Sequence, residues 1–134
     1  MKANELMIGD WIYIEHTEDG VAPYKELTQW TKEDFGFSDT FIKTHIYSVP
    51  LSPEILEKNG FKKQAFDGWE YDIRSKSGGD LVGLVLWRCD SPSPHLRIDT
   101  FTRNYGNFTS FDINYVHELQ HCLKLVGIDK DIVL

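Results

Sequence analysis

The residues with the most specific chemical pattern lie near the C-terminus, in the stretch YVHELQHCLKLVG. His117-Glu118-Leu119-Gln120-His121 has the spacing His-Glu-x-x-His. On a helix, two histidines four residues apart share a face and can bind Zn²⁺, while the glutamate acts on the zinc-bound water as general base. The string therefore defines one alternative function, a zinc-dependent hydrolase in which His117 and His121 bind the metal and Glu118 is catalytic.

The surrounding helix argues against a zinc site. At about 100° per residue, the helix predicted over residues 114–126 has one apolar sector, with His117, His121 and Lys124 on the opposite side. The apolar sector comprises Tyr115, Val116, Leu119, Cys122, Leu123 and Val126. We therefore expect both imidazoles on the solvated face of an amphipathic helix.

A third protein ligand is also missing from the local sequence. One zinc-peptidase class places a Gly and then a His after the second histidine, where this chain has Lys124 and Gly127, and another class needs a later Glu, which does not occur after His121. We predict no metal, no cofactor and no enzymatic activity.

Other candidate sites have simpler explanations. Cys89, Cys122 and His95 lack the paired cysteine spacing of structural zinc sites, so we expect two buried thiols in a reducing compartment. Glu70 and Asp72 alternate along a predicted strand, which is typical of a solvated strand face rather than of an acid–base pair.

The net charge of −7 disfavours nucleic acid, since phosphate binding depends on Lys and Arg. An alternative is weak nucleic-acid binding by a strand face bearing Arg74, Arg88 and Arg97. The N-terminus lacks a signal-peptide pattern and no segment approaches membrane-spanning length, so we expect a cytoplasmic protein that does not enter a membrane.

The order of helix and strand patterns along the chain indicates an α+β fold. We expect a mainly antiparallel sheet with a short central helix, a C-terminal helix packed on one face, and a small N-terminal β element resembling a partial barrel. Ser52, Pro53 and Gly60 delimit the central helix. The strands are predicted from alternating or continuous apolar runs, at 6–16, 26–30, 40–49, 68–75, 81–89, 95–101 and, at the closing edge, 131–134. Thr31 with Asp34 predicts a capped helical turn, and Asp19-Gly20 predicts a hairpin turn.

We expect one domain over 1–134, with a loose N-terminal β subregion at 1–48 and an α+β core at 49–134. Four tryptophans occur in the chain, and Trp11 and Trp30 lie in its acidic first third. Core packing explains such residues most simply. As an alternative, Trp11, Tyr13 and Trp30 form a candidate surface for contact with another protein.

Three blocks of the chain resemble a family of small proteins common in Bacteroidetes genomes and in their phages and mobile elements. MKANELMIGDWIY is similar to KANELRIGNYVY, YSVPLSPEILEKNGF to PIPLTEEILLKCGF, and FDINYVHELQHCLKLVG to IKYVHQLQNLYFALTG. The family pattern has Gln at the place of Glu118 and Asn at the place of His121, which implies that the zinc-peptidase string is specific to this chain. Residues 16–44 align with nothing in the pattern, and the resemblance assigns no activity.

Taken together, the sequence predicts a non-enzymatic accessory protein of phage or mobile-element origin that binds an unidentified protein partner.

Overall fold

The computed structural model describes the chain apart from residues 66, 73–80, 91–94, 103–105 and 126. The described residues form two antiparallel sheets, of three and five strands, and three α-helices, which confirms the α+β class. The chain divides into two compact units, unit 1 with residues 1–50 and 115–120 and unit 2 with residues 51–114 and 121–134. The predicted boundary after residue 48 stays a prediction.

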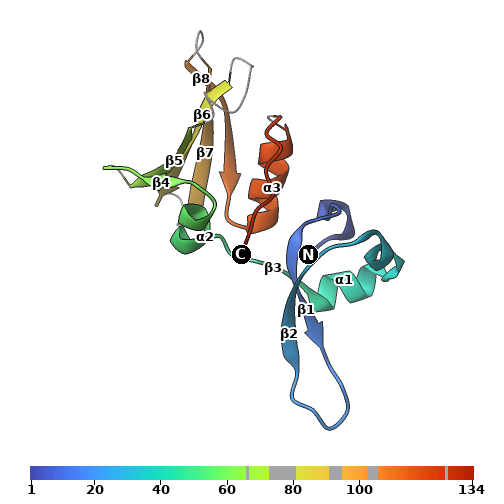
Figure 1. Cartoon of the computed structure of the whole chain (residues 1–134). Coiled ribbons are helices and arrows are strands. Elements are labelled where there is room, and N and C mark those ends of the chain that lie inside the picture. The colour runs from blue at the N-terminus through green and yellow to red at the C-terminus, as the bar shows by residue number, and fades with distance from the viewer. Residues whose placement is uncertain (66, 73–80, 91–94, 103–105, 126) are drawn as a thin grey trace. The chain divides into compact units, whose positions relative to one another are not determined.

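Unit 1 is built on the antiparallel sheet β2-β1-β3, which does not close into a barrel (Figure 1). Its elements are the 3₁₀ helix η1 (Ala3–Glu5), β1 (Trp11–His16), β2 (Tyr24–Gln29), the 3₁₀ helix η2 (Lys32–Gly36), α1 (Asp39–His45) and β3 (Ile46–Ser48). Alternation along β1 buries Ile12 and Ile14 on one face. The core of the unit gathers on that face and comprises Leu6, Ile12, Ile14, Trp30, Ile42 and Ile46.

Two local predictions in unit 1 are confirmed. The β1–β2 hairpin turns at Gly20, whose φ of 80° is a conformation that glycine adopts without steric cost. Thr31 and Asp34 form the predicted capping box before η2, since the Asp34 carboxylate accepts from the Thr31 N–H at 2.7 Å.

The strand predicted over 40–49 is wrong, because most of that stretch is the helix α1. The Ser38 side chain accepts from the Phe41 N–H at 3.1 Å, and Asp39 lies in the first turn, where a negative charge is favourable. Helical spacing then directs Ile42 into the core. Only Ile46–Ser48 is extended, where it pairs with β1.

Unit 2 holds a five-stranded antiparallel sheet in the order β4-β5-β6-β7-β8. Its elements are α2 (Pro53–Lys58), β4 (Lys62–Lys63), β5 (Gly68–Asp72), β6 (Leu81–Cys89), β7 (His95–Thr102), β8 (Gly106–Ile113) and residues 121–125 of α3 (Val116–Leu125). The buried residues of the unit include Leu56, Trp69, Leu86, Ile98 and Leu123. The C-terminal helix packs on one face of the sheet, as predicted, and none of the described helices is long and apolar enough to cross a membrane.

The central helix is also confirmed. Ser52 accepts from the Ile55 N–H at 3.3 Å, Pro53 occupies the first turn, and the chain leaves the helix through Gly60 at a φ of 89°. A Cβ at position 60 would lie 3.3 Å from the Tyr71 ring, so both the backbone conformation and the close ring favour glycine there.

The predicted closing strand at 131–134 is wrong. These residues are not in a sheet, but Asn59 binds them with its side-chain amide. Asn59 Nδ2 donates to the Val133 carbonyl at 2.7 Å, and Asn59 Oδ1 accepts from the Val133 N–H at 2.8 Å. One buried side chain therefore supplies the pairing that a neighbouring strand would otherwise give.

Residues 73–75 of the predicted strand and the predicted turn at 76–80 lie outside the described residues, as does most of the DSPSP loop.

Candidate functional site

The face of the three-stranded sheet opposite the core of unit 1 carries Trp11 and Tyr13, two of the three residues predicted as a contact surface. They alternate with the buried Ile12 and Ile14 and are partly exposed. The antiparallel register places Leu27 of β2 and Tyr47 of β3 on either side of Tyr13. Directly opposed residues on neighbouring strands point to the same face.

We call these four residues, Trp11, Tyr13, Leu27 and Tyr47, the outer sheet face. Leu27 is 42% exposed and Tyr47 is 37% exposed, so a cross-strand row of apolar side chains is accessible to solvent. Sequence analysis missed Leu27 and Tyr47. Their positions depend on the pairing register, which no short motif in YKELTQ or IYS reveals.

Charged and polar groups surround Tyr47. The Lys25 ammonium lies 3.9 Å from the centre of its ring, and the Tyr47 hydroxyl donates to the Thr44 carbonyl at 3.1 Å. Desolvation raises the pKa of Tyr47 above its ordinary value, and the neighbouring Glu15 carboxylate raises it further. The Lys25 contact and the hydrogen bond to Thr44 together orient the Tyr47 ring on the outer sheet face.

Trp30 does not belong to this surface. It is 1% exposed and packs in the core of unit 1, so its assignment to a contact surface is wrong and core packing is correct. Phe35 meets the Trp30 ring edge-on at a centroid distance of 5.6 Å, and Phe37 lies 6.2 Å away. These half-exposed rings cover Trp30 and form part of the core boundary.

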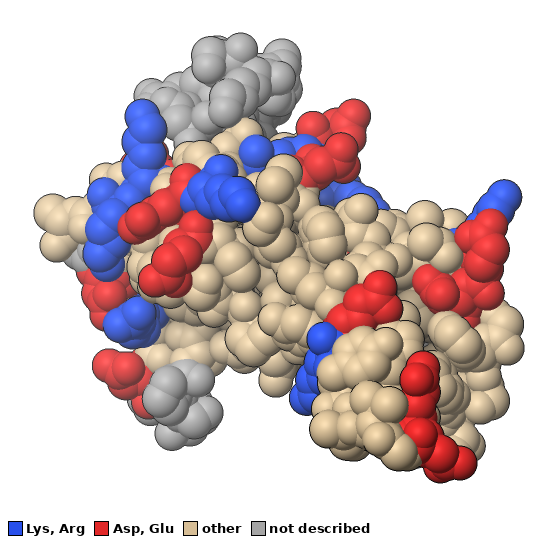
Figure 2. All heavy atoms as spheres, turned by 60° about the horizontal axis from the view of Figure 1, so that its bottom comes forward, with Lys and Arg blue, Asp and Glu red and all other residues tan. Residues whose placement is uncertain are grey.

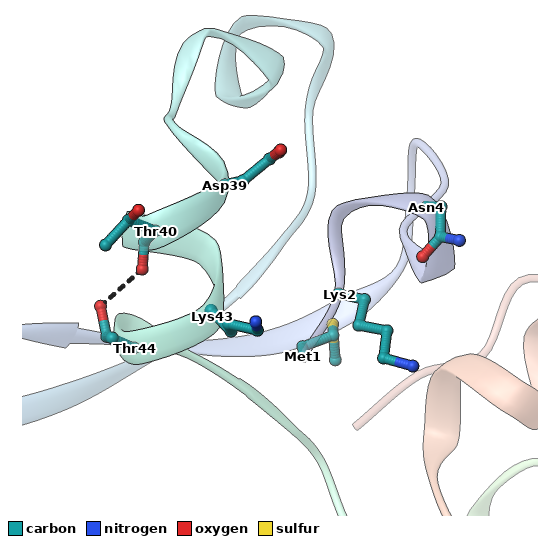
Figure 3. Close-up of a pocket in the computed structure, with 7 residues that line it drawn as sticks. All are labelled: Met1, Lys2, Asn4, Asp39, Thr40, Lys43 and Thr44. Carbon is teal, nitrogen blue, oxygen red and sulfur yellow. Dashed lines mark hydrogen bonds between the residues drawn. The ribbon is translucent and has the colours of Figure 1, made fainter.

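A cavity of about 390 Å³ lies beside η1 and α1 in unit 1 (Figure 3). Lys2, Lys43 and Asp39 are the charged side chains that line it. Figure 3 shows Lys43 directed toward Met1, whereas Lys2 and Asp39 extend elsewhere. The charged groups do not converge on one point, so the cavity lacks the arrangement that would bind an anion or a metal.

The histidines of α3 do not share an exposed face, contrary to prediction. His117 is 5% exposed and Tyr115, predicted to be buried, is 38% exposed, with their rings stacked at a centroid distance of 5.9 Å. Glu118 and His121 are partly exposed. Within the part of the chain that the structure describes, no three His, Cys, Asp or Glu side chains come together as a metal site.

Within the His-Glu-x-x-His string, Gln120 is the residue that bonds the backbone of unit 1, and it is not among the residues predicted from the sequence. Gln120 is 8% exposed, its Oε1 accepts from the Trp11 N–H at 3.0 Å, and its Nε2 donates to the Gly9 carbonyl at 2.9 Å. This side chain fixes the start of β1, the strand that carries Trp11 and Tyr13.

The strand face proposed for nucleic acid does not form. Arg88 pairs with Leu96, and Trp87 pairs with Arg97, so Arg88 and Arg97 lie on opposite faces of the five-stranded sheet. Arg74 lies outside the described residues. On the surface that Figure 2 shows, the described Lys and Arg side chains are interspersed with Asp and Glu and form no continuous basic band.

Arg97 instead pairs with a buried carboxylate on its own strand. Its Nε lies 3.3 Å from Oδ1 of Asp99, which is 3% exposed, and its terminal nitrogen donates to Oδ2 at 3.4 Å. A guanidinium that already forms an ion pair with a buried carboxylate contributes little to phosphate binding.

Comparison of the chain with protein-family models, with curated proteins and with solved structures finds no match. The resemblance to the Bacteroidetes family stays a prediction.

Proposed function

We propose that the chain is a non-enzymatic accessory protein of the cytoplasm that binds another protein through the outer sheet face. The observation that carries this proposal is the exposed row formed by Leu27, Tyr13 and Tyr47 on a sheet whose opposite face already holds the core of unit 1. A row of one leucine and two tyrosines at the centre of a sheet, with polar groups at its margin, resembles the centre and rim of protein interfaces.

The charge of the region indicates the chemistry of the partner. Residues 1–50 contain nine acidic and four basic side chains, and Glu15 lies on the same face as Tyr13. A protein with an apolar patch surrounded by Lys and Arg is complementary to this surface. We propose such a partner, in keeping with a phage-derived or mobile-element accessory role.

The test begins with a photo-crosslinking amino acid at position 27, introduced in the native host. Position 125 is the matched control, because Leu125 is 75% exposed and belongs to unit 2. The captured partner is identified, purified and titrated with the unmodified chain. We expect Leu27→Ala and Tyr47→Ala each to weaken binding at least tenfold, with Leu125→Ala unchanged.

The proposal fails if position 27 captures nothing beyond the control, or if the purified partner binds the variants as tightly as the original chain. A second copy of the chain as the only captured protein would also overturn it, and sedimentation velocity would then show a dimer.

Metal analysis tests the zinc-dependent hydrolase directly. Stoichiometric zinc in purified protein that disappears in His121→Asn would overturn the non-enzymatic proposal. Nucleic-acid binding at low salt that falls steeply as salt rises would favour the other alternative.

A further inference from the structure

A second cavity, of about 210 Å³, lies within unit 2 and has a different character. Leu56 of α2, Trp69 of β5 and Leu96 of β7 supply apolar walls, and Arg88 and His95 supply polar ones. The register explains why these groups meet, because Arg88 pairs directly with Leu96 and the next pair along the two strands is Cys89 with His95. The cavity thus joins an apolar wall to a cationic edge.

The cationic edge lies around the Trp69 ring. Lys63 and Arg88 both approach the Trp69 ring, at 4.4 Å and 5.8 Å from its centre. They share one carboxylate, that of Asp67, whose oxygens lie 3.3 Å from the Lys63 ammonium and 3.9 Å from Arg88 Nε. Two cations and one anion therefore surround the Trp69 ring, and Arg88 is the one of them that lines the cavity. The other polar wall, His95, lies 3.7 Å from the carboxylate of Asp112.

Arg88 has donors available for a ligand. Its 3.9 Å distance from Asp67 exceeds hydrogen-bond length, and its side chain is 49% exposed. A planar guanidinium can donate two parallel N–H groups to a carboxylate. Trp69 is 2% exposed and Leu56 is 1% exposed, so these side chains form the buried floor of the cavity, and the partly exposed Leu96 is its accessible apolar side chain.

We propose that this cavity binds a small monocarboxylate with an apolar body. The carboxylate pairs with Arg88 beside His95, and the apolar body packs against Leu96 above the buried side chains of Trp69 and Leu56. A monoanion matches the single guanidinium that lines the cavity better than a phosphate dianion, and the largely apolar wall favours a hydrocarbon or aromatic body. The volume equals that of about seven water molecules, which sets the size of the ligand near that of a substituted benzene ring.

Benzoate is the probe, and benzyl alcohol, with the same ring and no charge, is its control. Binding is followed by the indole N–H resonance of Trp69 during titration of the full chain. We expect saturable binding of benzoate in the millimolar range, and at least fivefold weaker binding of benzyl alcohol.

Three variants locate the site. Arg88→Gln should weaken benzoate binding at least tenfold, and Arg88→Lys should retain part of it. Lys62→Gln removes the same charge from the neighbouring strand position, on the face opposite Lys63 and Trp69, and should bind benzoate normally.

Equal binding of benzoate and benzyl alcohol, unchanged binding in Arg88→Gln, or no saturable shift of the Trp69 resonance would each overturn the proposal. The thermal unfolding temperature of Arg88→Gln is measured in the same buffer as the binding. If Arg88→Gln is unstable, the comparison uses Arg88→Lys instead. Inorganic phosphate that binds more tightly than benzoate would also refute the monocarboxylate assignment.

Discussion

Gln120 offers the sharpest test of how unit 1 is held together. Gln120→Ala removes the acceptor of the Trp11 N–H and one donor to the Gly9 carbonyl, whereas Gln29 Nε2 still donates to that carbonyl at 3.0 Å. The lost Gly9 bond costs about 1 kcal/mol, and burial of the Trp11 N–H without this acceptor costs about 2 kcal/mol. We expect the free energy of unfolding to fall by about 3 kcal/mol.

Two further variants separate hydrogen bonding from packing. Gln120→Met keeps the side-chain length but removes both polar atoms, so it should cost nearly as much as Gln120→Ala. Gln29→Ala removes an exposed bond to the same carbonyl oxygen and should cost about 0.5 kcal/mol.

Urea unfolding followed by tryptophan fluorescence gives the three free energies, since Trp11 and Trp30 both lie in unit 1. A Gln120→Met protein as stable as the original chain would show that packing, and not the two hydrogen bonds, is what Gln120 supplies. Equal costs for Gln120→Ala and Gln29→Ala would refute the role of burial.

Three other predictions concern Asn59, Gly60 and Cys122 of unit 2. Asn59→Ala should lower the free energy of unfolding by about 3 kcal/mol and speed hydrogen exchange at the Val133 amide, because a 3% exposed side chain loses both bonds to that residue. Gly60→Ala should cost about 1–2 kcal/mol in thermal unfolding, since its φ is 89° and the Tyr71 ring is close, whereas Gly36→Ala, with open space around it, should cost less than Gly60→Ala. Burial raises the pKa of the Cys122 thiol from 9.0 to about 11, so the folded state retains a proton that the unfolded state loses in this window. The free energy of unfolding should therefore fall by up to about 3 kcal/mol between pH 9 and pH 11, and Cys122→Ala should lack that part of the fall in urea titrations at each pH.

Capping signals predicted the helical segments best, because the residues that form a cap are neighbours in sequence. The Ser52 side chain accepts from the Ile55 N–H, and Thr31 forms a capping box with Asp34. Each cap lies within three residues in sequence, and both predicted helical segments are present. The same chemistry occurs at Ser38, but the prediction for 40–49 rests only on the alternation of apolar residues. Ten residues of alternation are also compatible with a short helix followed by a short strand. The hydrogen bond from the Phe41 N–H to the Ser38 side chain stabilises the helix.

The candidate surface was only partly predictable for a different reason. Period-two alternation places Trp11 and Tyr13 on one side of β1 without any tertiary information. Leu27 and Tyr47 join them only through the register of two antiparallel pairs. The surface prediction for Trp30 rests on its acidic neighbours in sequence, yet the segment that follows it packs Phe35 and Phe37 against the indole.

The burial pattern of α3 shows why the histidines were placed wrongly. A helix that packs on one surface buries a stripe little more than about 100° wide, and the prediction for His117 assumed such a stripe. The buried residues of α3 are Val116, His117, Leu119, Gln120, Cys122 and Leu123, which span roughly 220° at 100° per residue. Residues 116–120 belong to unit 1 and residues 121–125 to unit 2. The His117 imidazole, on the side of the helix opposite the leucines, is therefore still buried. The wide buried stripe also places Gln120 inside the protein, where its amide bonds the backbone of Gly9 and Trp11. The His-Glu-x-x-His spacing in this chain thus coincides with a helix that buries His117 and Gln120 together with its apolar residues.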